Sequence, residues 1–193
     1  ETEYEAFLHI KEMRDKYEYM QGFNVESNKE IAKTLAMFGA FTEGLQLFAS
    51  FAILLNFPRF NKMKGMGQIV TWSARDETLH TNSIIKLFHT FLSENPDVKR
   101  EDLAKDLYVA CDTVIKHEDA FIDRAFELGG VEGLDAKTVK EYIRYIADNR
   151  LAQLEMDPLY NIGKNPLPYM DDMLNALEHT NFFENRATEY SRA

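Results

Sequence analysis

The sequence is poor in cysteine, and its single thiol, Cys111, excludes an internal disulfide framework. A lone cysteine is typical of a protein in a reducing cytoplasm, and the apolar setting YVACDTV favours a packed thiol over a nucleophile. Clustered basic residues are also lacking, because the 22 Lys and Arg are scattered among 32 Asp and Glu, with a net charge of -10. Phosphate contacts need grouped Lys and Arg, so this composition argues against a nucleic-acid-binding protein.

No signal peptide and no convincing β-strand pattern are visible. One apolar stretch, residues 34–58, is long enough to suggest a membrane span. Glu43 and Gln46 lie inside it, however, and the neighbouring segments are amphipathic, which favours a buried core helix. The chain begins at Glu1 instead of Met, so we expect a cleaved, trimmed or partial chain.

Proline and glycine are few, and they punctuate a succession of amphipathic segments that are typical of helices. The expected helices cover residues 2–20, 28–57, 68–94, 98–128, 135–155 and 169–179. Ser27 and Glu30 form a capping box before the second helix, and Asp135 caps the fifth. Gly65 and Gly67 mark the junction before the third helix. The pattern predicts an all-α fold with helices long enough for a bundle.

Glu43 is the one charged residue between Lys33 and Arg59. It lies in the middle of a helix among Phe and Leu residues, where an unpaired carboxylate would have to bind a proton or a cation. Three interpretations stay open for this residue alone. It is a metal ligand, a carboxylate on the polar edge of the helix, or a partner in a buried ion pair with a distant arginine.

A second signal is the pair Glu77 and His80, which are three residues apart and therefore share one helix face. Glu-x-x-His is the pair used by di-iron and di-manganese bundles, in which a carboxylate bridges two hard ions and an imidazole binds one. Alone, the pair also fits the polar surface of an amphipathic helix. Glu43 lies 34 residues earlier, so two antiparallel helices would bring the three side chains to one level, as half of a di-metal site.

The remaining histidines are weaker candidates for a metal site. His117 has the acidic neighbours Glu118 and Asp119, but a solvated helix face explains this group better. His9 and His89 lack any ligand spacing.

The chain resembles a known family, and the resemblance is carried by the stretches TEGLQLFASFA, ARDETLH and NFFENRATEYS. Together they are similar to the small, radical-generating subunit of class I ribonucleotide reductase, over essentially the whole chain. The resemblance implies a ferritin-like helical bundle in which Glu43 is a terminal ligand of the second metal, Glu77 bridges the metals and His80 binds the second metal. It also implies that Asp76 hydrogen-bonds a metal-bound histidine on the radical-transfer route. The family has a metal-free branch that replaces several ligand glutamates, and Glu43 and Glu77 argue against it.

The same resemblance implies residues that this chain lacks. The family uses a second ligand set, an Asp or Glu and another Glu-x-x-His, followed in most members by a radical tyrosine, and the sequence has no such set upstream. Tyr4, Tyr17 and Tyr19 are interpreted as packing residues. Tyr190 is not the tyrosine of the family's flexible tail, which docks on the large subunit. Residues 1–193 are therefore expected to be the C-terminal portion of one ferritin-like domain, with half of the di-metal site.

The implied function is that of the small subunit of ribonucleoside-diphosphate reductase, in the cytoplasm. With its missing half it would hold Fe/Fe, Mn/Fe or Mn/Mn and, with oxygen, generate the radical or oxidising equivalent that the large subunit uses in deoxyribonucleotide synthesis. The expected partners are a complementary N-terminal half, the large subunit and a second completed small subunit; nucleic acid and membrane are not expected. Without the missing half and the large subunit the chain is expected to be inactive. Two alternatives remain, a non-catalytic structural half-subunit and another ferritin-like di-metal oxidase.

Overall fold

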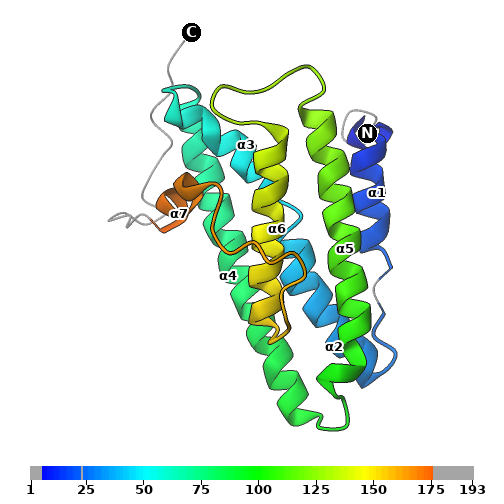
Figure 1. The fold of residues 1–193 in the computed structure, drawn as a ribbon. Coiled ribbons are helices and arrows are strands. Elements are labelled where there is room, and N and C mark those ends of the chain that lie inside the picture. Colours follow the sequence, from blue (N-terminus) through cyan, green and yellow to red (C-terminus); the bar gives the residue numbers. More distant parts are fainter. Residues whose placement is uncertain (1–5, 23, 176–193) are drawn as a thin grey trace.

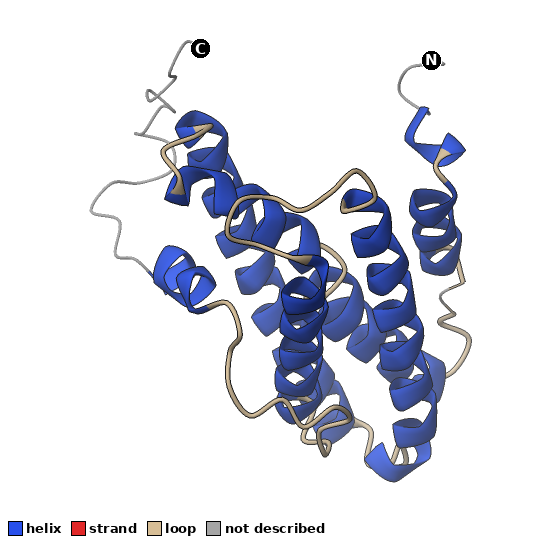
Figure 2. Cartoon of the chain, turned by 45° about the horizontal axis from the view of Figure 1, so that its top comes forward, coloured by secondary structure: helices blue, strands red, loops and turns tan. Residues whose placement is uncertain are grey.

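The computed structural model describes residues 6–22 and 24–175, and the regular elements in these ranges are helical (Figures 1 and 2). The α-helices are α1 (Lys11–Met20), α2 (Asn28–Ala36), α3 (Phe48–Arg59), α4 (Lys64–Glu94), α5 (Arg100–Ala125), α6 (Ala136–Gln153) and α7 (Pro168–Asn175). A short 3₁₀-helix, η1 (Ala6–His9), precedes α1, and a π-helix, η2 (Met37–Glu43), lies between α2 and α3. The predicted all-α, ferritin-like class is confirmed.

The long helices α4, α5 and α6 lie side by side, and the segment α2–η2–α3 packs against all three (Figure 1). Helix α1 lies along α5, and α7 lies against α4. The centre of the bundle is rich in aromatic and aliphatic side chains that are fully buried, among them Phe41, Phe48, Phe88, Leu107 and Tyr142. Each such side chain contributes about 1.5–3 kcal/mol through burial, so this core is the main support of the segment that carries Glu43.

The prediction of one continuous helix over residues 28–57 is wrong. Helix α2 does begin at the expected cap, where Ser27 Oγ accepts a hydrogen bond from Glu30 N at 3.2 Å. The chain then becomes the π-helix η2, and residues 44–47 form a turn before α3. Within this region Gln46 N donates to Phe41 O, five residues back, at 3.2 Å. The extra residue in the turn changes the direction in which downstream side chains point.

The apolar stretch is the core of the bundle. In the described part of the chain, the helical run Asn28–Arg59 is long and apolar enough for a membrane span, and its most apolar 18-residue window has a mean hydropathy of 1.5. In the folded chain 67% of that window is buried. Burial by protein on this scale is what a core segment requires, as the sequence predicted.

The glycines before α4 do not separate two helices, contrary to the prediction. Gly65 and Gly67 are buried in the first turn of α4, and the junction lies earlier, where Asn61 (φ 62°) and Met63 (φ 49°) adopt left-handed conformations. Gly67 faces the ring of Pro58, which lies in the last turn of α3, and a Cβ at this glycine would overlap that ring. The glycine therefore permits close contact between α3 and α4.

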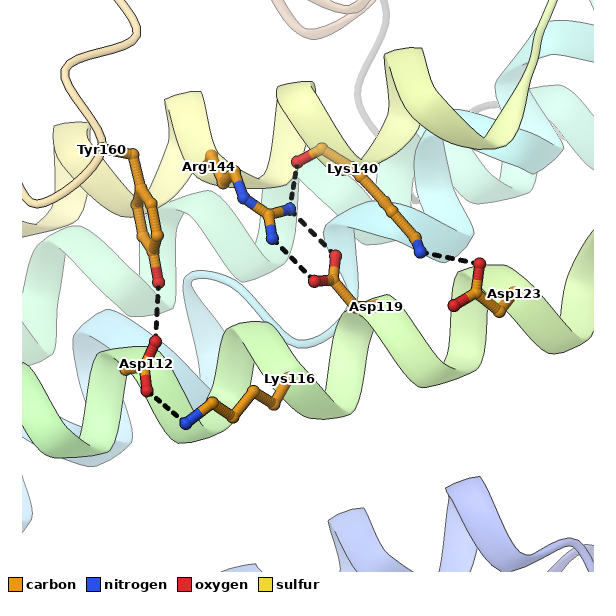
Figure 3. A network of polar contacts seen from close by, with 7 residues as sticks. All are labelled: Asp112, Lys116, Asp119, Asp123, Lys140, Arg144 and Tyr160. Atoms are coloured by element: carbon orange, nitrogen blue, oxygen red, sulfur yellow. Dashed lines mark hydrogen bonds and ion pairs between the residues drawn. The ribbon is translucent and has the colours of Figure 1, made fainter.

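A polar seam joins α5 to α6 at the surface (Figure 3). Arg144 donates to both carboxylate oxygens of Asp119, at 2.9 and 2.6 Å, and Lys140 pairs with Asp123 at 2.6 Å. Helix α6 begins as predicted, because Asp135 Oδ1 accepts from Thr138 N at 2.7 Å. Exposed ion pairs contribute about 0–1 kcal/mol each, so the seam contributes less to stability than the apolar core.

Candidate metal centre

The structure brings together the three predicted ligands, Glu43, Glu77 and His80. Glu43 is the last residue of η2, and the other two lie midway along α4, which packs directly on η2. His80 Nδ1 is 3.6 Å from Glu43 Oε2 and 3.7 Å from Glu77 Oε2. One ligand atom of each side chain lies within 4.8 Å of the others. Ligand atoms about 2.0–2.2 Å from one ion are ~3–4 Å apart, so a small contraction would enclose a metal.

Close packing between η2 and α4 brings these three side chains together. Gly39 faces Ile84, one turn after His80, and a Cβ at position 39 would lie 2.7 Å from Ile84 Cγ2. Any larger residue would therefore push η2 away from α4. Since Glu43 lies one turn along η2 from Gly39, the glycine allows its carboxylate to reach the α4 pair.

The electrostatics of the centre favour a bound cation. The side chains of Glu43 and Glu77 are 21% and 20% exposed. Burial and, to a smaller extent, the Glu43 carboxylate raise the pKa of Glu77 to about 7. Glu77 Oε2 is buried, and no hydrogen bond from the described residues reaches it. Two half-buried carboxylates with an unsatisfied oxygen are costly unless a proton or a metal compensates them. The residues therefore fit a hard metal ion, with two carboxylates and one imidazole.

The interpretation of Glu43 as a buried partner of an arginine finds no support among the described residues. The ionic neighbour that the structure gives this carboxylate is His80. Interpretation as a fully solvated carboxylate does not fit either, because the side chain is largely covered by the bundle. The neighbours of Glu43 are thus the two other predicted ligands.

Asp76 lies on the open side of the centre. Its carboxylate is 65% exposed, and Oδ1 is 3.7 Å from His80 Nε2, longer than a hydrogen bond. His80 is itself 51% exposed. A shift of a few tenths of an ångström would let Asp76 accept from Nε2–H, which would leave Nδ1 directed toward the two glutamates.

Other candidates fall outside the centre. Cys111 is buried, and burial raises the pKa of its thiol to about 12, so the prediction of a packed thiol is confirmed. His117 and Glu118 do not form the predicted solvated face: the imidazole packs edge-on against Tyr19, with ring centroids 5.6 Å apart, and Glu118 is fully buried. Tyr19 packs against the core, as expected, but Tyr17 is 44% exposed, so the prediction that it is a packing residue is wrong. Tyr4, Tyr190 and the stretch NFFENRATEYS lie outside the described residues.

Arg150, which was not predicted from the sequence, contacts the turn after Glu43. Its Nε donates to Gly44 O at 2.9 Å in the interior of the bundle. Its position on the otherwise apolar face of the predicted helix is the signal that could have identified it. Arg150 follows Ile143 and Ala147 on the core face of α6, where a charged residue needs an explanation.

Comparison with known proteins identifies the family. The sequence matches the family described as ribonucleotide reductase, small chain, over residues 1–166. The chain belongs to this family. It is 43% identical to the probable ribonucleoside-diphosphate reductase small subunit of Invertebrate iridescent virus 3, over 98% of this chain and 55% of that protein. It is 32% identical to the ribonucleoside-diphosphate reductase subunit beta of Chlamydia pneumoniae, over 89% of this chain and 50% of that protein.

Solved structures of ribonucleotide reductase proteins share the fold. A putative class I ribonucleotide reductase from Bacillus halodurans superposes with a TM-score of 0.80, at 21% identity, over 88% of this chain and 62% of that chain. Streptococcus sanguinis dimanganese(II)-NrdF superposes with a TM-score of 0.66, at 19% identity, over 84% and 56%. The resemblance inferred from the sequence is thus confirmed for the family and the fold. The chain spans 50% to 62% of the length of these proteins.

Proposed function

We propose that this chain supplies half of the di-metal centre of a ribonucleoside-diphosphate reductase small subunit. In this proposal residues 1–193 are the C-terminal portion of a single ferritin-like domain. The observation that carries it is the convergence of Glu43, Glu77 and His80 around a buried carboxylate oxygen that accepts no hydrogen bond from the described part of the chain. Membership of the small-chain family supports a redox role for these ligands.

The proposed roles follow from the position of each side chain. Glu43, Glu77 and His80 would hold the metal pair: Glu43 as a terminal ligand, Glu77 as the carboxylate shared by the two metals, and His80 as the imidazole ligand, with Nδ1 as the atom that faces both glutamates. Asp76 holds the proton on Nε2 and couples the centre to the route by which the oxidising equivalent leaves. When bound, the Fe/Fe, Mn/Fe or Mn/Mn pair supplies that oxidising equivalent. Carboxylate and imidazole ligands suit both iron and manganese.

The open side of α4 supports the proposal of a complementary N-terminal half. Ile69, Asp76, His80 and Leu87 share one face of α4 at spacings of seven, four and seven residues, and all are exposed. Exposed leucine and isoleucine beside metal ligands indicate a surface that other helices cover. We propose that this half brings the second ligand set, and that the completed small subunit pairs with a second copy and with the large subunit. In this proposal the isolated chain is inactive, and the completed assembly is active in the cytoplasm.

A non-catalytic structural half-subunit is the second candidate. The half-exposed imidazole and the incomplete ligand set favour it for the isolated chain. Another ferritin-like di-metal oxidase would use the same three ligands, but the family match favours the reductase.

Metal titration of the purified chain tests the proposed centre. We expect Mn(II) or Co(II) to bind the wild type, with water completing the coordination, and Glu43→Gln, Glu77→Gln and His80→Ala each to lower the affinity at least about tenfold. Asp123→Asn is the control, since Asp123 pairs with Lys140 and is not one of the three grouped side chains. Retention of full affinity by Glu77→Gln would rule out the proposed centre.

A further inference from the structure

Arg150 is a buried cation that has no anionic partner within residues 6–22 and 24–175. The residue is 7% exposed, and none of the ion pairs among the described residues involves it. Burial lowers the pKa of its guanidinium to about 10. A guanidinium in a core position is unfavourable unless its donors are used, so the contacts that it makes should explain its presence.

These contacts link the two elements that carry the ligands. Arg150 Nε donates to Gly44 O at 2.9 Å, directly after Glu43. Its Nη1 donates to Gln153 Oε1 at 2.9 Å, and Gln153 Nε2 donates to Asn82 Oδ1 at 3.2 Å. Asn82 lies on α4, two residues after His80. One hydrogen-bonded chain therefore runs from the turn after Glu43, through α6, to the helix that carries the Glu-x-x-His pair.

The turn between η2 and α3 is built around this arginine. A Cβ at Gly44 would lie 2.8 Å from Arg150 Nε and 2.5 Å from Ala40 O, so the close approach depends on the glycine. The guanidinium also lies over the Phe48 ring, 5.4 Å from its centroid. The turn interrupts the regular ladder of backbone hydrogen bonds, and Arg150 satisfies one of its carbonyls in a place that water does not reach.

A second cation, Lys16 of α1, contacts the same turn. Lys16 Nζ lies 3.4 Å from Gln46 O and forms an ion pair with Glu118 of α5. Gly44 and Gln46 are thus fixed by side chains of α6 and α1. Glu43, directly before them, takes its position from this turn.

We propose that Arg150 is a positioning residue of the metal centre: through Gly44 on one side and Gln153–Asn82 on the other, it sets the distance between Glu43 and the Glu77–His80 pair. The proposal rests on the proposed function, in which these three residues bind metal. Metal sites demand ligand positions held to about 0.5 Å, so loss of this link should loosen coordination without removing a ligand.

The test compares variants that cut the link with a matched variant that does not. Arg150→Met removes the buried cation, Arg150→Lys keeps a donor, and Gln153→Ala cuts the link at an exposed residue. Arg144→Met is the control, because Arg144 lies on the same helix and pairs with Asp119 of α5 instead of a residue of the turn (Figure 3). Two readouts are used: the affinity and visible absorption spectrum of bound Co(II), and amide hydrogen exchange of residues 40–48 in the metal-free chain.

We expect Arg150→Met to weaken Co(II) binding by about tenfold or more, with a changed absorption spectrum and faster exchange in residues 40–48. Gln153→Ala should show the same changes to a smaller degree, Arg150→Lys should restore part of the affinity, and Arg144→Met should match the wild type in both readouts.

Wild-type affinity, spectrum and exchange in Arg150→Met would overturn the positioning role. If that variant does not fold, Gln153→Ala decides by the same criteria. Glu77→Gln separates this inference from the proposed function. Unchanged Co(II) binding in Glu77→Gln would mean that the metal binds elsewhere. That result would refute both the proposed centre and the role of Arg150 in positioning its ligands. Loss of binding in Glu77→Gln together with wild-type behaviour of both link variants refutes the positioning role alone.

Discussion

At the scale of single residues, the protonation of Glu77 depends on its burial and on the Glu43 carboxylate beside it. Burial and the nearby Glu43 carboxylate raise its pKa to about 7, so near neutrality a proton and a metal ion compete for it. Below this pH the carboxyl is protonated, and a cation must displace the proton. Above it the carboxylate is free to bind.

Metal affinity should therefore rise with pH through about 7 and level off above it. Below the pKa of Glu77, one proton released per ion bound makes the affinity fall by about tenfold per pH unit. Mn(II) titrations of the chain at about pH 6, 7 and 8 measure this slope. An affinity that does not change over this range would contradict the assignment of Glu77 as a ligand.

Glu118 is a second buried carboxyl with a raised pKa, and it is paired with Lys16 between α5 and α1. Burial outweighs the attraction of Lys16 and raises the pKa of Glu118 from 4.5 to about 7. The folded state thus holds this proton more tightly than the unfolded state does. Stability contributed by the protonated carboxyl is present below about pH 4.5 and is lost as the pH rises to about 7.

Lys16→Met should be most harmful at high pH. At about pH 8 the ionised Glu118 is left buried without its partner, which costs about 3–5 kcal/mol of unfolding free energy. At about pH 5.5 the neutral carboxyl needs no partner, and the cost should be smaller. Urea unfolding at both pH values measures the difference. Lys11→Met is the control, because Lys11 pairs with Asp15 on the exposed side of the same helix and its loss should change stability little at either pH. An equal cost of Lys16→Met at both pH values would contradict this explanation.

At the scale of elements, the sequence predicted the features that depend on residues close together in the chain, such as helix caps. Ser27 and Asp135 cap helices where expected, since a capping side chain bonds a backbone N–H three residues away. The π-helix was not predicted. The segment around it is apolar on most of its faces, so the spacing of apolar residues does not show where the helical period changes. Arg150 was missed for a related reason: its partner, Gly44, is 106 residues away in the sequence.

Gly39 is a point of close contact between η2 and α4. Gly39→Ala should cost about 1–3 kcal/mol of stability, because the added Cβ would meet Ile84 Cγ2 at 2.7 Å. Combining it with Ile84→Ala should recover part of that cost. Chemical unfolding of the two single variants and the double variant gives the coupling energy, expected to exceed about 0.5 kcal/mol. Additive effects would mean that the two residues do not set the spacing.

At the scale of the whole molecule, the all-α bundle and its family could both be predicted from the sequence. The Glu-x-x-His pair and its neighbours are short contiguous motifs, which can be recognised without knowledge of the fold. The open face of α4 could not be read in this way. Its exposed stripe depends on which helices cover α4, and that is a property of the packed bundle. The face carries Leu87 at 52% exposure beside His80.

Leu87→Asp should therefore prevent docking of a complementary half without unfolding the chain. The partner for this test is the part of the iridescent virus relative that this chain does not cover. Leu128→Asp is the matched control, since Leu128 is fully exposed beyond the end of α5. Co-expression and size-exclusion chromatography should show a complex with the wild type and Leu128→Asp, and none with Leu87→Asp. Equal complex formation by both variants would show that the complementary half does not cover this face.

The most direct test of the central claim is the metal content of the chain reconstituted with such a complementary half. The proposal predicts about two ions of iron or manganese per pair of chains, and almost complete loss of both in Glu77→Ala. A stable pair that contains no metal would contradict the proposed centre and would identify the chain as a structural half-subunit.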